Sequence, residues 1–265
     1  MTNLAILGCG KIAKFHIPAM QAAGFKVTAI AGRPGSAEKL HKFSLENNLC
    51  KAEVYNDPND LITSNNWDAL LLCCSTNAMI GYINSLQNKK KPILVEKPVS
   101  YNSLSLKELK DHDHIRVAYN RRFYKTVSYA KNFVSQNENL IAKVSIPEIS
   151  NLESDALSFP KRLPLKSYEN SVHVIDILRY TLGNFEVIYK KNVVNEQNYL
   201  AIICIGVTET GNTIVIDSCY NAPDNFKIDY ISKTKRLELK PIELAKLYDG
   251  MQIADPSETL PIRMY

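Results

Sequence analysis

The feature that most restricts the fold of this chain is a glycine-containing turn near its N-terminal end, Gly8-Cys9-Gly10-Lys11-Ile12-Ala13. The turn fits the pattern GxGxx(G/A), with an apolar run before it and an amphipathic segment after it. In this setting Gly8 permits a tight bend, Gly10 lets the backbone approach a pyrophosphate, and the small Ala13 lets a helix pack closely on a strand. The helix N-terminus then faces the anion. The turn therefore predicts a dinucleotide-binding unit, with a glycine turn of an unrelated α/β protein as the alternative.

Short apolar runs alternate with amphipathic stretches through the first 120 residues, which is typical of βαβ units around a parallel sheet. The expected strands are Leu4–Leu7, Phe25–Ala31, Ala52–Tyr55, Ala69–Cys74, Pro92–Val95 and Ile115–Tyr119. The expected helices are Ile12–Ala23, Ala37–Asn47, Asp60–Thr63, Met79–Gln87 and Leu104–Lys110. In the first helix, Ile12, Phe15 and Ala19 fall along one apolar stripe. We expect residues 1–120 to form a Rossmann-like α/β domain that binds NAD(P).

The pattern changes after residue 120, where strand-like runs follow one another with one strong helical segment among them. The expected strands are Ile141–Ile149, Phe185–Val194, Leu200–Thr208, Thr213–Cys219, Lys227–Ser232 and Arg236–Leu239, and the expected helix is Val172–Leu182. The turn Glu209-Thr210-Gly211-Asn212 separates two β-branched runs and predicts a hairpin. Residues 121–265 are therefore expected to form an α+β domain with a largely antiparallel open sheet. For the segment Met251 to Tyr265 we expect either an arm over a neighbouring subunit or a frayed end.

Charge and cysteine content exclude several functional classes. The 32 basic and 27 acidic residues leave a net charge of +5, which does not resemble the balance of a nucleic-acid binder. The longest apolar stretch, Ala69–Cys74, is far shorter than the roughly 20 residues that span a bilayer, and no secretory signal is expected. The six cysteines show no CxxC spacing, which predicts reduced thiols in a cytosolic protein. Asp111-His112-Asp113-His114 is too tightly clustered to surround one ion, so no metal is expected.

The residues after the second expected strand indicate which dinucleotide is bound. A carboxylate at this point hydrogen-bonds the ribose 2′-hydroxyl of NAD, whereas an arginine accommodates the 2′-phosphate of NADP. Here Gly32-Arg33-Pro34 follows the strand, and no carboxylate occurs before Glu38. Arg33, with Ser36 as a further phosphate partner, therefore predicts a preference for NADP(H). A solvated Arg33 and the use of NAD(H) form the alternative.

Two further groups of polar residues occupy informative positions. Glu96-Lys97-Pro98 follows the expected strand Pro92–Val95, which places a lysine at the carboxyl edge of the sheet, where nicotinamide and substrate would meet. Farther along, Glu169, His173 and Asp176 have the i, i+4, i+7 spacing that puts them on one face of a helix. That face is polar, so the apolar residues of the same helix are free to pack elsewhere.

Together these motifs resemble the Gfo/Idh/MocA oxidoreductases over nearly the whole chain. The resemblance rests on the Gly8–Ala13 turn with His16, on Ser75-Thr76-Asn77, on Glu96-Lys97-Pro98 and on the His173-x-x-Asp176 helix. It implies that Lys97 positions the substrate and tunes proton transfer, that His173 acts as acid and base, and that Glu169 assists His173. The chemistry agrees, because histidine titrates near neutrality and a lysine charge favours a developing alkoxide. The expected cofactor-binding residues are Gly8, Gly10, Lys11, Ile12, Ala13, Arg33, Ser75, Thr76, Asn77, Glu96 and Lys97.

The sequence departs from the family pattern at several positions. Thr76 replaces the proline usual in its turn, Ile80 stands where a histidine often follows, and Glu169 replaces the commoner aspartate. The longer side chain of Glu169 moves the carboxylate by about one methylene, so the substrate is expected to differ. The chain is also shorter than is usual in the family, and the shortfall falls in the second domain. Its pocket is then either reduced or completed by another subunit.

Other polar residues are weaker candidates for substrate contacts. Asn120 and Arg122 resemble the family's segment that lines the cleft, although an arginine there can equally bridge the two domains. Lys161 and Arg162 suit a carboxylate or a diphosphate, or else are merely solvated. Asp176, on the helix of His173, is a further candidate.

We therefore expect a cytoplasmic NAD(P)-dependent oxidoreductase, with NADP(H) preferred, that transfers hydride reversibly to or from a sugar, nucleotide sugar or inositol-like polyol. The resemblance implies a homodimer or homotetramer formed through the open face of the second sheet, and neither nucleic acid nor a membrane is expected as a partner. Two alternatives stay open: a biliverdin-reductase-like or imine-reducing enzyme, and a noncatalytic regulator that binds NADP or a sugar. A hydrolase is set aside, because no GxSxG elbow occurs.

Overall fold

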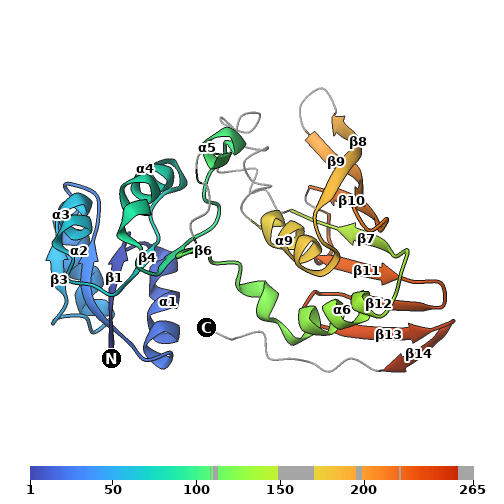
Figure 1. Cartoon of the computed structure of the whole chain (residues 1–265), viewed down its shortest axis with the longest axis horizontal. Coiled ribbons are helices and arrows are strands. Elements are labelled where there is room, and N and C mark those ends of the chain that lie inside the picture. The colour runs from blue at the N-terminus through green and yellow to red at the C-terminus, as the bar shows by residue number, and fades with distance from the viewer. Residues whose placement is uncertain (108, 110–112, 149–169, 195–198, 221, 256–265) are drawn as a thin grey trace. The chain divides into compact units, whose positions relative to one another are not determined.

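The computed structural model describes residues 1–107, 109, 113–148, 170–194, 199–220 and 222–255 (Figure 1). The chain divides into two compact units, of which the first contains Met1–Ala118 and the second begins at Tyr119. Each unit has its own sheet and its own buried core. Of the helices in the described ranges, none combines the length and the apolar character needed to cross a membrane.

The first unit is a six-stranded parallel sheet in the order β3-β2-β1-β4-β5-β6. Its strands are β1 (Thr2–Leu7), β2 (Phe25–Ala31), β3 (Glu53–Tyr55), β4 (Ala69–Leu72), β5 (Ile93–Val95) and β6 (Ile115–Val117). Its helices are α1 (Lys11–Ala22), α2 (Ala37–Glu46), α3 (Pro58–Ser64), α4 (Thr76–Leu86) and α5 (Ser103–Lys107). This is the strand order of Rossmann folds, which reverses between β1 and β4. The predicted α/β fold is confirmed, and the carboxyl ends of β1 and β4 mark the expected ligand crevice.

Two apolar clusters, one on each face of this sheet, explain why its strands are almost continuously apolar. On one face Leu4 and Ile6 of β1 pack with residues of α1 and α2. On the other face Ala5 and Leu7 pack with residues of α3 and α4. Because helices cover both faces, β4 and the Leu4–Leu7 part of β1 are buried on both sides, and the alternation of polar and apolar residues is lost there.

Helix α1 buries a different face from the one that its apolar spacing suggested. Ala13 and Ile17 are buried against the sheet, whereas Ile12 and Phe15 are 42% and 46% exposed. Successive residues of a helix are rotated by about 100°, so a helix that is aligned by the close fit of Ala13 turns Ile12 away from the strand. The stripe that contains Ile12 and Phe15 is therefore not the core-facing side of this helix.

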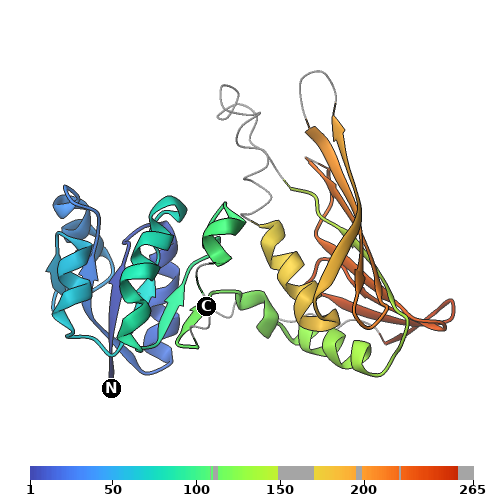
Figure 2. The same cartoon turned by 45° about the horizontal axis from the view of Figure 1, so that its top comes forward.

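The second unit is an eight-stranded sheet with two helices packed on one of its faces (Figure 2). The strand order is β14-β13-β12-β11-β7-β10-β9-β8, and within the described part of this sheet β7 and β10 form the one parallel pair. The strands are β7 (Ile141–Ser145), β8 (Phe185–Val194), β9 (Tyr199–Thr208), β10 (Thr213–Cys219), β11 (Lys227–Ile231), β12 (Lys235–Leu239), β13 (Ala245–Asp249) and β14 (Gln252–Asp255). The helices are α6 (Lys125–Ser135) and α9 (Ser171–Leu182), and the short 3-10 helix η2 (Asn120–Phe123) precedes α6.

The predicted α+β class, with a largely antiparallel sheet, is confirmed. The predicted hairpin is also present, because β9 and β10 pair as antiparallel strands across a turn in which Gly211 has a φ of +84°. Two of its backbone hydrogen bonds close the turn, from Thr208 N–H to the Asn212 carbonyl and from Gly211 N–H to the Thr208 carbonyl, both 2.9 Å long.

The sequence did not predict α6, β13 or β14. Helix α6 buries Val127, Ala130 and Phe133 at helical spacing, a signal that is present in the sequence but interrupted by lysine, tyrosine and asparagine. Strand β14 pairs with β13, so residues Gln252–Asp255 belong to the sheet and are neither an arm nor a frayed end. Residues 256–265 lie outside the described part of the chain.

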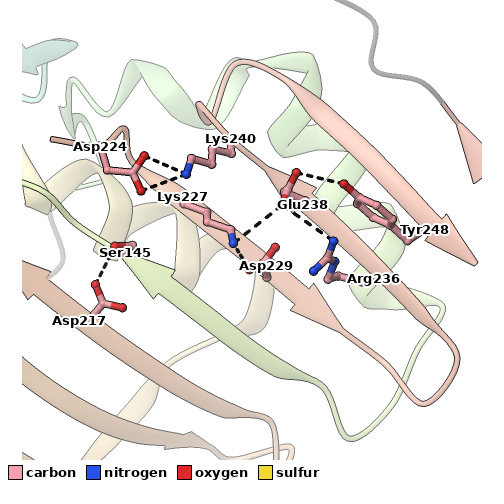
Figure 3. A network of polar contacts seen from close by, with 9 residues as sticks. All are labelled: Ser145, Asp217, Asp224, Lys227, Asp229, Arg236, Glu238, Lys240 and Tyr248. Atoms are coloured by element: carbon pink, nitrogen blue, oxygen red, sulfur yellow. Dashed lines mark hydrogen bonds and ion pairs between the residues drawn. The ribbon is translucent and has the colours of Figure 1, made fainter. Parts of the chain in front are cut away.

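The sheet face turned away from α6 and α9 carries a network of charged side chains and several exposed apolar ones. Figure 3 shows the charged network, where Lys227 Nζ lies 2.8 Å from Asp229 Oδ2 and Ser145 Oγ donates to Asp217 Oδ1 at 2.6 Å. The pairing of β7, β8, β9 and β10 puts three exposed apolar or aromatic side chains on the same face, namely Ile141, Tyr189 and Ile203. In the described residues no helix of this unit packs on this face (Figure 2).

Candidate active site

The turn between β1 and α1 approaches the turn between β4 and α4 so closely that glycine is required at position 8. Gly8 has a φ of +100°, and a Cβ built on it would lie 2.5 Å from the carbonyl carbon of Cys73. Backbone bonds of 2.8 Å, from Gly8 N–H to the Ala31 carbonyl and from Cys73 N–H to the Leu7 carbonyl, join β1, β2 and β4 at this point. The tight turn expected of Gly8 is therefore present, at the point where the strand order reverses.

Gly10 has the opposite surroundings. A Cβ built on Gly10 would meet no atom within 4 Å, and this residue is the extended N-cap of α1, with φ −90° and ψ −173°. The first N–H groups of a helix have no intrahelical partner, and Gly10 has no side chain to cap them. Open space before uncapped N–H groups suits a pyrophosphate, so the residues present fit a dinucleotide. Lys11 and Ile12 are exposed, whereas Ala13 is fully buried and lets α1 pack on the sheet, as its small size predicted.

Arg33 is exposed on a defined turn after β2. Ser36 donates to the Arg33 carbonyl oxygen twice, from its hydroxyl at 2.6 Å and from its backbone N–H at 3.1 Å. A Cβ built on Gly32 would lie 2.6 Å from Ser36 Oγ, so the turn leaves no room for a side chain there. The hydroxyl hydrogen of Ser36 is committed to this turn, and Arg33 is therefore the stronger of the two expected partners for a 2′-phosphate.

The expected cofactor residues of the β4–α4 turn lie next to the glycine turn. Ser75 is the N-cap of α4, and Ser75 and Asn77 are exposed while Thr76 is partly buried. Because a Cβ on Gly8 would touch the backbone of Cys73 and Cys74, the two turns adjoin one another. The structure thus brings these two groups of predicted residues together at one edge of the sheet.

Glu96 is held on both of its carboxylate oxygens by the protein itself. The side chain is 11% exposed; Oε1 lies 2.6 Å from His16 Nε2 on α1, and Oε2 accepts a hydrogen bond of 3.0 Å from the Lys97 backbone N–H. Glu96 thereby joins α1 to the segment that carries Lys97, whose side chain is partly buried. A cofactor contact by Glu96 stays a prediction, whereas its contact with His16 is a feature that sequence reasoning missed.

Three of the six cysteines surround the glycine turn, and all six are free thiols. Burial raises the pKa of the Cys9 thiol to about 12 and that of Cys74 to about 11, and it raises the pKa of Cys73 as well. Cys9 Sγ lies 3.7 Å from the Ala31 carbonyl oxygen, to which it donates. These thiols are therefore protonated near neutral pH, so they are poor nucleophiles. The reduced state of the cysteines in a cytosolic protein stays a prediction.

In the second unit, α9 brings His173 and Asp176 together, but the face that carries them is buried rather than exposed. Asp176 is held in a bidentate pair, with Arg122 Nε donating to Oδ2 at 2.6 Å and Arg122 Nη2 donating to Oδ1. The ring of Tyr119 meets the ring of His173 edge-on, with centroids 6.2 Å apart and planes at 80°. Tyr119 and Arg122, from the segment that begins this unit, thus cover the side of α9 that carries His173.

The charges in this cluster are largely compensated. The hydrogen bond to Asp176 raises the pKa of Arg122, and the guanidinium lies 5.3 Å from the ring centre of Tyr180. Burial raises the pKa of Tyr119, and the Asp176 carboxylate raises it further, so this phenol is protonated at neutral pH. Arg122 and Asp176, each expected to contact a substrate, bind one another, and Asn120 is exposed. A substrate contact by any of the three stays a prediction.

Sequence reasoning missed Glu148, which lies three residues after β7 and is only 3% exposed. Its Oε1 accepts a hydrogen bond of 2.6 Å from the backbone N–H of Ser171 and a second, from Ser171 Oγ, of 2.5 Å. Nothing in the sequence near Glu148 distinguishes it from a surface glutamate.

Several predicted residues lie outside the described part of the chain, namely Glu169, Lys161, Arg162, Asp111 and His112. Within the described residues, no group of three or more His, Cys, Asp or Glu side chains is arranged to hold a metal ion.

Comparisons with known proteins agree with this geometry. Residues 2–127 match the model of a family described as an oxidoreductase family with an NAD-binding Rossmann fold, GFO_IDH_MocA. A myo-inositol 2-dehydrogenase from Thermotoga maritima is 25% identical over 188 residues, which are 68% of this chain and 55% of that protein. The chain thus spans about half the length of the curated relatives it matches.

Solved structures show that the fold is shared over both units. An oxidoreductase from Thermotoga maritima has a TM-score of 0.78 at 18% identity, covering 96% of this chain and 82% of that one. A myo-inositol dehydrogenase from Lactobacillus casei, in complex with NAD(H) and myo-inositol, has a TM-score of 0.73 at 18% identity, covering 98% and 80%.

Proposed function

Because the chain belongs, through residues 2–127, to the Gfo/Idh/MocA oxidoreductase family with its NAD-binding Rossmann fold, we propose that it is an NAD(P)-dependent dehydrogenase acting on CH–OH groups. The observation that carries the proposal is the contrast within one turn. Gly8 is packed against the backbone of Cys73, while Gly10 faces open space before α1. A dinucleotide site at the switch point of a parallel sheet requires both features.

The proposed roles of the polar residues follow from the chemistry of alcohol oxidation. A hydroxyl proton must leave as hydride leaves the carbon, and we assign the transfer of this proton to His173, assisted by Glu169. The ammonium group of Lys97 would stabilise the alkoxide that develops through its positive charge. The bound nicotinamide would supply the hydride acceptor. Arg122 and Tyr119 would hold the helix that carries His173.

We further propose that NADP(H) is preferred over NAD(H). Arg33 is exposed on the turn after β2, and the sequence offers no carboxylate between this strand and Glu38. A guanidinium binds a phosphate bidentately, whereas a carboxylate is needed to bind the ribose 2′-hydroxyl. Arg33 therefore supports NADP(H), although the matched family is described as NAD-binding.

The substrate proposed is a polyhydroxylated ring: a sugar, a nucleotide sugar or an inositol-like polyol. The support is the similarity of the chain to a myo-inositol 2-dehydrogenase and to a fold neighbour that binds myo-inositol. Near His173, the Arg122–Asp176 ion pair compensates the charges of these two residues.

We also propose a homodimer or homotetramer that forms through the uncovered face of the second sheet. The exposed side chains of Ile141, Tyr189 and Ile203 on this face would meet the same residues of a second copy around a two-fold axis. The measurement is light scattering of the wild type and of Ile203→Lys. A monomeric wild type would remove this proposal.

The experiment that tests the function measures reduction of NAD⁺ and NADP⁺ by a panel of substrates: myo-inositol, glucose and UDP-N-acetylglucosamine. We expect turnover with at least one of them, and a higher kcat/KM with NADP⁺. In Lys97→Ala and His173→Ala, turnover should fall by about 10²- to 10⁴-fold while dinucleotide binding persists. Dinucleotide binding without any turnover would favour a noncatalytic regulator. Reduction of biliverdin or an imine by NADPH would favour the biliverdin-reductase-like or imine-reducing enzyme over a dehydrogenase of polyols. Absence of dinucleotide binding would remove the proposal.

A further inference from the structure

Glu148 places a buried carboxylate at the first turn of α9. One of its oxygens, Oε1, accepts two hydrogen bonds from the same residue, from the backbone N–H and from the hydroxyl of Ser171. Glu148 and Ser171 are 23 positions apart in the sequence. The contact therefore joins the end of the β7 segment directly to the start of α9.

A buried carboxylate is an expensive group for a protein to keep, because water must be removed from its charge. Two features of this place offset the cost. The N-terminus of a helix carries partial positive charge and unpaired N–H groups, so an anion is favoured there. Both hydrogen bonds from Ser171 also have a carboxylate as acceptor, and such charge-assisted hydrogen bonds are stronger than those between neutral groups. Glu148 thus acts on α9 as an anionic cap supplied by another element of the fold.

This cap lies beside the residue to which we assign proton transfer. His173 is two positions after Ser171 in the same turn, and its backbone N–H donates to the Asn170 carbonyl at 3.0 Å. On the C-terminal side of His173, the bidentate pair of Asp176 with Arg122 holds the next turn. The buried ring of His173 is therefore carried by a piece of helix that is tied on both sides to other parts of the unit.

We propose that Glu148 is a positioning residue for His173: its carboxylate fixes the first turn of α9 and, through it, the orientation of the His173 ring. The inference rests on the proposed function only in that His173 is taken as the group that moves the proton. Glu148 itself acts through Ser171 and contacts no reacting atom in this assignment.

The test is NMR of the full chain, without substrate, in the wild type and in Glu148→Ala. We expect amide hydrogen-exchange protection at Ser171 and His173 to fall about tenfold, and the His173 ring resonances to shift and broaden. Ring signals are assigned by their loss in His173→Gln. In Glu148→Gln both effects should be largely rescued, because the amide oxygen can accept the same two hydrogen bonds. Glu209→Ala, which removes an exposed glutamate from the β9–β10 turn, is the matched control and should change neither.

Two results would overturn the inference. One is an unchanged His173 spectrum in Glu148→Ala; the other is a uniform loss of protection that includes the strands β10 and β11, which would mean a general loss of stability. If Glu148→Ala fails to fold, Ser171→Ala removes only the hydroxyl donor and should give a smaller change of the same kind. The assay of His173→Ala with the substrate panel is independent of these spectra, so failure of the proposed function is distinguished from failure of the positioning role.

Discussion

His16 Nε2 on α1 lies 2.6 Å from Glu96 Oε1 at the end of β5, and the two residues are 80 positions apart in the sequence. The same carboxylate accepts the backbone N–H of Lys97. One buried group therefore ties the helix of the glycine turn to the segment that carries the proposed substrate-positioning lysine. This relationship makes the first unit sensitive to a change at His16.

His16→Ala should lower the free energy of unfolding of the first unit by about 1 to 3 kcal/mol, because the buried Glu96 carboxylate loses a partner and gains none. The measurement is urea unfolding followed by the fluorescence of Trp67, the single tryptophan of the chain, which is buried in this unit. Lys14→Ala is the control, because it breaks an exposed ion pair of α1 with Glu46 and should have much less effect. Equal effects of the two variants would contradict the expectation.

Gly8→Ala should lower the stability of the first unit, whereas Gly10→Ala should weaken dinucleotide binding. In Gly8→Ala the new methyl group would clash with the Cys73 backbone in a conformation with positive φ, so we expect a loss of about 2 to 4 kcal/mol of stability. Gly10→Ala should unfold like the wild type but bind the dinucleotide about tenfold or more weakly, since its methyl group would occupy the space before α1. The same Trp67 fluorescence and a titration with NADPH separate the two outcomes; normal NADPH affinity in Gly10→Ala would contradict the placement of the pyrophosphate.

Arg33→Ala should raise the Kd for NADPH by about tenfold to a hundredfold and leave the Kd for NADH almost unchanged, because a charge-assisted bond to the 2′-phosphate is lost. The measurement is a fluorescence titration with each reduced dinucleotide. Lys26→Ala, at an exposed position on the preceding strand β2, is a control for the loss of one positive charge. An equal loss of affinity for NADPH and NADH would mean that Arg33 does not bind the 2′-phosphate.

Arg122→Met should destabilise the second unit by about 2 to 3 kcal/mol, which is less than for a fully buried pair because the Arg122 side chain is 39% exposed while that of Asp176 is 7% exposed. Asp176→Leu in addition should recover most of this loss, since the uncompensated buried charge is then gone. The measurement is unfolding followed by circular dichroism, because Trp67 does not report on this unit. If the double variant loses the sum of the stabilities that Arg122→Met and Asp176→Leu each lose alone, the two residues are not coupled.

The stability of the first unit should fall in alkaline solution partly through Cys9. Burial raises the pKa of this thiol from 9.0 to about 12 in the folded chain, so the unfolded chain loses its proton first. The part of the free energy of unfolding that is linked to this thiol is therefore complete below about pH 9. It decreases as pH rises, by about 1 kcal/mol for each pH unit, until the pKa of the folded chain is reached. Urea unfolding at about pH 8 and about pH 10 should show a smaller loss in Cys9→Ala than in the wild type. Equal losses would mean that Cys9 is not a source of the effect.

The sequence by itself determined the fold class of both units and the place of the glycine turn. The apolar runs of β1 and β4, the helical spacing in α2 and the glycine at position 211 act over a few neighbouring residues, so their signals are readable without knowledge of the fold. The requirement for Gly8 and the openness at Gly10 were predicted for the same reason, because the GxGxx(G/A) pattern is a local one. Helix α6 was missed although its apolar spacing is also local, because polar residues interrupt it.

Only the tertiary structure decided which side chains act together. The pairs His16–Glu96, Arg122–Asp176 and Glu148–Ser171 join positions that are 80, 54 and 23 residues apart. Which of them meet depends on how helices pack on a sheet and in which register strands pair, and no stretch of sequence encodes either one alone. The same reason explains why α1 buries Ala13 and Ile17 rather than Ile12 and Phe15: a helix with two apolar sides is aligned by the partner on which it packs.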